Sequence, residues 1–167
     1  MQNRLLKELR EFAEHTLKWQ QIPVREKKIL FVGEEISFAS RYRVEHFREQ
    51  LHYQGYGSDF YQVDEVKDLD WDAYRAVVCY RCSREDVVCK VVEQAKKTGL
   101  NVYYDIDDLI FDYERISYLH FLTGSEYKDF KKTTEQIHSC MELCDGYFTS
   151  TDTLAGEIRR EFPGKQW

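Results

Sequence analysis

Residues 99–112 read GLNVYYDIDDLIFD, and this stretch decides the expected fold. Residues 101–104 contain β-branched and aromatic residues and are entered through Gly99, which is typical of a strand that begins just after a helix ends. The chain then turns acidic at Asp105, Asp107 and Asp108. Open α/β sheets bind ligands outside the carboxyl ends of their strands, so these carboxylates are candidate site residues. The alternative, in which one carboxylate caps the next helix and the others are solvated, stays open.

The rest of the chain alternates strands and helices around this stretch. Apolar runs predict further strands at residues 28–32, 59–63, 75–80 and 147–149. Helical spacing of apolar residues predicts helices between them, with caps at Ser83 and Thr151. The pattern predicts an α/β fold, a Rossmann-like doubly wound, mostly parallel five-stranded sheet with helices on both faces. An extra amphipathic helix is expected at residues 3–20, so that residues 1–24 form a helix and linker and residues 25–167 the Rossmann-like domain.

Charge and composition exclude several classes of protein. A net charge of −6 and a pI near 5.4 argue against a nucleic-acid binder and give no support to association with a membrane surface. The sequence has no apolar run long enough to cross a bilayer and no signal peptide, so a cytoplasmic protein is expected. The odd number of cysteines, five, fits reduced thiols better than a disulfide framework.

The loops after the first and third predicted strands supply further candidates. Gly33 is expected to permit a backbone turn, and Arg41 and Arg43 open the following helix, where guanidinium groups can hold an anionic ligand. Arg81 directly follows the third strand. Solvated surface arginines remain the alternative. One glycine is too few for the dinucleotide fingerprint, so NAD is disfavoured and no cofactor is expected.

Histidine and cysteine patterns give weaker signals. His120 falls in a loop region near the predicted site and is a candidate ligand contact, whereas the other histidines are scattered. Cys79 and Cys82 form a C-x-x-C pair, but the first lies in a strand and no second pair completes a zinc site. Buried, unreactive thiols are therefore expected, and no metal site is predicted.

The Asp105-x-Asp107 motif allows two other chemistries. It resembles the nucleophile motif of haloacid-dehalogenase-type phosphatases, whose first carboxylate attacks phosphorus. That family places the motif on an early strand, and here it follows the fourth, with Leu109 where a threonine is usual. A metal-binding DxD of the other main glycosyltransferase fold is an equally short match.

Several segments together resemble the amino-terminal half of a family 4 glycosyltransferase with the two-domain GT-B architecture. They are residues 40–51 (SRYRVEHFREQL) with Gly55, 76–81 (AVVCYR), 99–112, and 149–161 (TSTDTLAGEIRRE) before FPGK at 162–165. The resemblance implies a domain that binds an acceptor, which can be a glycan, lipid or protein. It also implies that a nucleotide sugar is bound only with a second, carboxy-terminal domain, and that no metal is obligatory.

We therefore expect an acceptor-binding half of a glycosyltransferase that is inactive by itself. Asp105 and Asp107 are the catalytic candidates. The expected substrate-binding residues are Gly33, Arg41, Arg43, Arg81, Asp108 and His120. The competing hypothesis is a Rossmann-like binding or interaction module that does no chemistry.

Overall fold

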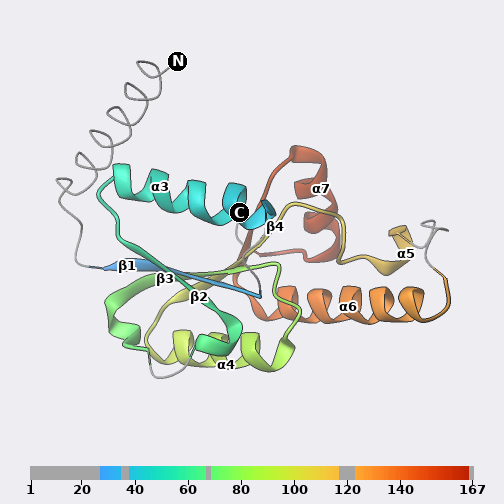
Figure 1. The fold of residues 1–167 in the computed structure, drawn as a ribbon, viewed down its shortest axis with the longest axis horizontal. Coiled ribbons are helices and arrows are strands. Elements are labelled where there is room, and N and C mark those ends of the chain that lie inside the picture. Colours follow the sequence, from blue (N-terminus) through green and yellow to red (C-terminus); the bar gives the residue numbers. More distant parts are fainter. Residues whose placement is uncertain (1–26, 35–37, 67–68, 117–122, 166–167) are drawn as a thin grey trace, which may run out of the picture.

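The computed structural model describes residues 27–34, 38–66, 69–116 and 123–165 (Figure 1). The predicted helix at residues 3–20, its linker and the candidate His120 lie outside the described residues. None of the helices in the described ranges combines the length and apolar content that crossing a bilayer requires.

The described chain forms one five-stranded sheet, and all neighbouring strands run parallel. The strands are β1 Lys28–Gly33, β2 Ser58–Gln62, β3 Tyr74–Tyr80, β4 Asn101–Ile106 and β5 Gly146–Thr149, in the order β2-β1-β3-β4-β5. The predicted α/β class with a Rossmann-like sheet is confirmed. The chain proceeds from β1 to one side and then returns to β3 on the other side, so the topological switch point lies between β1 and β3.

Helices cover both faces of this sheet (Figure 1). Residues 38–53, between β1 and β2, are helical and lie on the face opposite α4 (Glu85–Lys97) and α6 (Gly124–Leu143). The helices are α2 Phe38–Ser40, the π-helix η1 Arg41–Glu45, α3 His46–Tyr53, α4 Glu85–Lys97, α5 Tyr113–Ile116, α6 Gly124–Leu143 and α7 Asp152–Glu161, with 3₁₀ turns η2 Val63–Glu65 and η3 Trp71–Ala73.

Burial on both faces explains the continuous apolar runs of the strands. Val77 and Cys79 of β3 pack in the larger core with α4 and α6, whereas Val78 and Tyr80 pack on the opposite face with Val44 of η1. A strand that is covered on both sides has no polar face, and its sequence therefore lacks alternation.

Two predicted helix caps have different outcomes. The Thr151 hydroxyl accepts a hydrogen bond from the backbone N–H of Leu154 at 3.2 Å, so this cap of α7 is confirmed. The predicted cap at Ser83 is wrong, because α4 begins at Glu85 and its N-cap residue is Arg84, whose side chain makes no capping bond within the described chain. Ser83 is held instead by a carboxylate from another loop, which belongs to the site below.

Candidate functional site

One row of residues crosses four strands near the carboxyl edge of the sheet. Gly33 of β1 pairs with Tyr80 of β3, Tyr80 pairs with Asp105 of β4, and Asp105 pairs with Phe148 of β5. Strands that run parallel end at the same edge, so the residues following this row come together on one side of the molecule. The row passes the switch point between β1 and β3, where doubly wound sheets bind their ligands.

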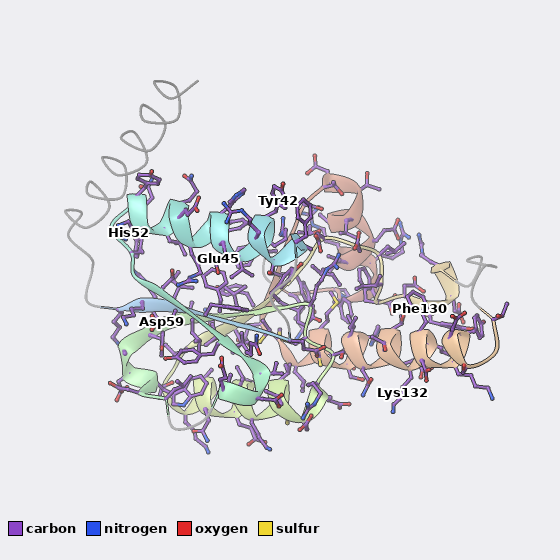
Figure 2. The ribbon with its side chains drawn as sticks, viewed as in Figure 1. Tyr42, Glu45, His52, Asp59, Phe130 and Lys132 are labelled. Atoms are coloured by element: carbon purple, nitrogen blue, oxygen red, sulfur yellow. The ribbon has the colours of Figure 1, made fainter. Side chains whose placement is uncertain are left out.

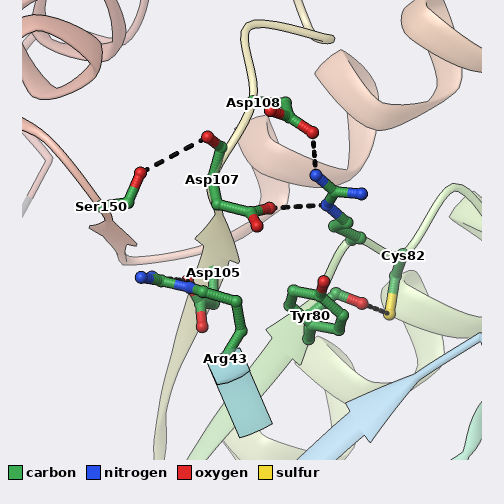
Figure 3. Close-up of polar contacts among 8 residues, drawn as sticks. Arg43, Tyr80, Cys82, Asp105, Asp107, Asp108 and Ser150 are labelled. Atoms are coloured by element: carbon green, nitrogen blue, oxygen red, sulfur yellow. Dashed lines mark hydrogen bonds and ion pairs between the residues drawn. The ribbon is translucent and has the colours of Figure 1, made fainter. Parts of the chain in front are cut away.

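Arg43 and Asp105 form the more buried of two arginine–carboxylate groups (Figure 3). Nε and Nη2 of Arg43 both donate to Oδ1 of Asp105, the first at 3.2 Å. The exposed fractions of the two side chains are 13% and 3%. Arg43 is supplied by η1, a π-helical turn of a kind often found at functional sites. Its guanidinium carbon also lies 5.6 Å from the ring centroid of Phe47, which adds a cation–π contact.

The environment of Asp105 makes its carboxylate unusually basic. Burial raises the pKa of Asp105 to about 6, and this effect outweighs the hydrogen bond and charge of Arg43, which act in the opposite direction. A buried carboxylate loses the hydration that favours its charged form, and a single cation restores only part of that stabilisation.

Arg81 joins the two other acidic residues of the predicted site. Its Nε donates to Oδ1 of Asp107 at 2.6 Å, and its Nη2 bonds Oδ2 of Asp108. Burial alone would lower the pKa of the guanidinium, but the carboxylate of Asp107 helps to raise it above its ordinary value. Arg81 has a φ of +47°, in the left-handed region, and its backbone N–H donates to the carbonyl of Asp105 at 3.1 Å. The side chain and the backbone of Arg81 thus both hold β3 to the end of β4.

Tyr80 lies between these two groups and was not a candidate from the sequence (Figure 3). Its side chain belongs to the core, with 3% of the residue exposed, yet its hydroxyl has no hydrogen-bond partner among the described residues. Burial raises the pKa of Tyr80 to about 12, and the charges of Arg81, Asp107, Asp105 and Arg43 also act on it. A buried hydroxyl without a partner is unusual in folded proteins.

Glu34, directly after β1, was also missed by sequence reasoning. Its carboxylate accepts hydrogen bonds from the Ser83 hydroxyl at 3.1 Å, the Arg84 backbone N–H at 2.8 Å and the Ser83 backbone N–H. Beside it lies a pocket of about 430 Å³, a size within the range of small-molecule sites. The pocket is lined by Glu34, Tyr80, Arg81, Ser83, Ile110, Thr133 and Ile137.

The structure therefore brings most of the predicted site residues together. Arg43, Arg81, Asp105, Asp107 and Asp108 form what we call the charged cluster. Their roles toward a ligand stay predictions. Arg41 lies on η1 but is exposed and outside these ion pairs.

Gly33 lies in the same row, but the reason expected for its glycine is wrong. Its φ is not in the left-handed region, because Gly33 is still part of β1. A Cβ atom at this position would lie 3.1 Å from Cε2 of the Phe60 ring. The close approach of that ring to the backbone, and not a turn, is what favours glycine here.

The cysteines match the expectation of buried, reduced thiols. All five are free, and Cys79, Cys82, Cys140 and Cys144 are buried. Burial raises the pKa of Cys140 to about 12, which keeps its thiol protonated and unreactive. In the described part of the chain no group of three or more histidine, cysteine or acidic residues is placed to hold a metal ion.

No family model matches the chain, and no curated protein shows significant similarity to it. What the site can do chemically therefore follows from its own groups. Asp107, with 21% of its side chain exposed, can reach a ligand, whereas the almost fully covered Asp105 is suited to hold Arg43.

Proposed function

We propose that this chain is the acceptor-binding half of a nucleotide-sugar-dependent glycosyltransferase with GT-B architecture. In that arrangement a second domain grips the nucleotide sugar, and the sugar passes to an acceptor hydroxyl in the cleft between the domains. The proposal rests on the resemblance in residues 40–51, 76–81, 99–112 and 149–161, all of which reach or flank the carboxyl edge of the sheet.

One observation carries the proposal. The charged cluster and the pocket of about 430 Å³ share Arg81: the cluster lies at the carboxyl ends of β3 and β4, and the pocket lies at the switch point between β1 and β3. This is the position at which a doubly wound domain presents a ligand to a facing domain. Its hydrogen-bonding groups, with apolar side chains beside them, suit a ligand that carries several hydroxyls.

The two catalytic candidates have different environments and therefore different proposed roles. Asp107 would accept the proton of the acceptor hydroxyl, because its carboxylate is partly exposed and is oriented by Nε of Arg81 at 2.6 Å. Asp105 would act through Arg43, since it is too deeply buried to touch a substrate. No cofactor takes part in this scheme.

We also propose that the protein is cytoplasmic. The five free cysteines support a reducing compartment, where thiols persist without pairing.

Calorimetric titration of the chain with methyl glycosides and with UDP- and GDP-sugars tests the proposal. We expect weak glycoside binding, no micromolar binding of nucleotide sugars and no turnover. Holding donor and acceptor in reacting geometry contributes roughly 7 to 11 kcal/mol to catalysis, and one domain forgoes most of this. Asp107→Asn should weaken glycoside binding about tenfold, as expected for one hydrogen bond to a charged group.

Asp64→Asn is the matched control, because its carboxylate has 81% exposure and lies outside the charged cluster. It should bind glycosides like the unmodified chain. Micromolar binding of a nucleotide sugar would refute the proposed division of labour, and absence of glycoside binding would refute the acceptor role.

A second candidate function is a non-catalytic interaction module. The observation that favours it is a set of exposed aromatic side chains along the helical segment after β1. Phe38 is 79% exposed, Tyr42 52% and Phe47 45%, and Tyr42 lies on the outer side of the helix (Figure 2). Large exposed apolar groups often mark protein–protein contacts. This function would be favoured if the unmodified chain binds no glycoside and if Phe38→Ser abolishes binding to a protein partner.

A further inference from the structure

The start of α4 has the hydrogen-bond donors of an anion site, and a carboxylate of the protein itself already occupies them. Backbone N–H groups at the beginning of a helix attract phosphates and carboxylates. Here the N–H groups of Ser83 and Arg84 and the Ser83 hydroxyl all donate to the Glu34 carboxylate. Because β1 carries Glu34 to this position across the switch point, a phosphate would have to displace a charge that three hydrogen bonds already hold.

The other charges at the pocket also disfavour an anion. Arg81 is the cation of the pocket lining, but its Nε is paired with Asp107 and its Nη2 with Asp108. Together with Glu34, these carboxylates outnumber the one guanidinium group of Arg81. A phosphate would meet like charges at short range, and like charges repel most where water is partly excluded.

The remaining groups of the lining suit a neutral ligand. Ile110 and Ile137 supply apolar surface, and Thr133 a hydroxyl. A sugar ring offers C–H faces to the first kind of surface and hydroxyls to the second.

We infer that the pocket beside Glu34 and Arg81 binds a neutral, hydroxyl-bearing group, such as an unphosphorylated sugar ring, and rejects its phosphorylated form. This inference rests on the proposed function and specifies the chemistry of the acceptor. Glu34 determines the selectivity by occupying the anion position.

The experiment is an NMR titration of the full chain, following backbone amides, with methyl glycosides, the matching sugar 1-phosphates and inorganic phosphate. We expect methyl glycosides to shift the amide signals of Arg81, Ser83 and Arg84. Sugar phosphates should bind at least about tenfold more weakly than the methyl glycosides. In Glu34→Gln the negative charge is removed while an acceptor oxygen is kept. Sugar phosphates should then bind about tenfold more tightly than to the unmodified chain.

Asp64→Asn is again the control, since it removes one charge near Arg84 outside the pocket and should not alter the selectivity. Equal or tighter binding of the sugar phosphates by the unmodified chain would overturn the inference and leave the acceptor role standing. Glycoside shifts confined to other amides would overturn the location. If neither class of ligand binds, the proposed function itself fails. The unmodified chain decides these outcomes even if Glu34→Gln does not fold.

Discussion

Arg43 donates two hydrogen bonds to a single oxygen of Asp105, although 62 residues separate them in the sequence. The pair links η1 on one face of the sheet to β4, two strands away from β1. Both side chains are largely removed from water, so neither charge is stabilised well without the other.

Replacing Arg43 by methionine should therefore destabilise the protein by about 3 to 5 kcal/mol at pH 7.5, because it leaves the carboxylate of Asp105 buried without its cation. Urea unfolding followed by tryptophan fluorescence measures this loss. The double variant Arg43→Met/Asp105→Leu should recover most of it. If Arg43→Met alone lowers the free energy of unfolding by less than about 1 kcal/mol, the pair is not buried as described.

The pH dependence of stability should carry the signature of Asp105. Its pKa is raised from 3.8 to about 6 in the folded protein, so between these values the folded state holds a proton that the unfolded state releases. The contribution of Asp105 therefore favours folding at low pH and is lost as the pH rises through about 6. At about 1.4 kcal/mol per pKa unit, the loss is on the order of 3 kcal/mol.

Unfolding free energies measured from pH 4 to 7.5 for the unmodified protein and Asp105→Asn isolate this effect, since the amide does not titrate. Relative to Asp105→Asn, the unmodified protein should lose unfolding free energy as the pH rises from 4 to 7.5. Carbon NMR of the Asp105 carboxyl provides a direct reading, and a pKa below 4 would contradict the expectation.

Two tyrosines on β3 should respond in opposite ways to loss of the hydroxyl. The Tyr74 hydroxyl donates to Asp59 at 2.9 Å, so Tyr74→Phe should cost about 1 kcal/mol. The Tyr80 hydroxyl is buried without a partner in the described residues, so Tyr80→Phe should be neutral or stabilising. Thermal unfolding of the two variants makes the comparison. An equal loss in both would mean that the Tyr80 hydroxyl is satisfied by a group outside the described residues.

Gly33→Ala should destabilise the protein by about 1 kcal/mol, because the added methyl group crowds the Phe60 ring. Adding Phe60→Leu should recover part of the loss. Glycoside affinity should stay unchanged, since Gly33 acts through packing. Chemical denaturation and the same ligand titration measure both properties, and weakened binding with intact stability would instead assign Gly33 a direct contact.

The sheet could be predicted because its strands carry their own signal. Each of the five observed strands overlaps a predicted one, with ends that differ by two residues at most. Residues 29–32 and 76–80 are apolar without alternation, as expected for strands covered on both faces. The N-cap of α4 could not be predicted, because the donor groups of Ser83 and the carboxylate of Glu34 lie 49 residues apart.

The acidic and basic members of the site could be predicted for a related reason. Parallel strands deliver the residues that follow them to one edge, so Arg81 and Asp107 had to be near one another. The burial and the hydrogen-bond partners of each group could not be predicted from this rule. Whether Asp105 is buried, whether Tyr80 finds a partner and why Gly33 is glycine depend on side chains that approach from other elements.

The row Gly33, Tyr80, Asp105 and Phe148 also determines which mutations the site tolerates. Successive residues of a strand point to opposite faces, so removing one residue from β4 before Asp105 would turn its carboxylate toward α4 and α6 and bring an apolar neighbour to Arg43. Insertions and deletions within the strands should thus abolish the site, while length changes in the loops at the opposite, amino-terminal edge leave the row aligned.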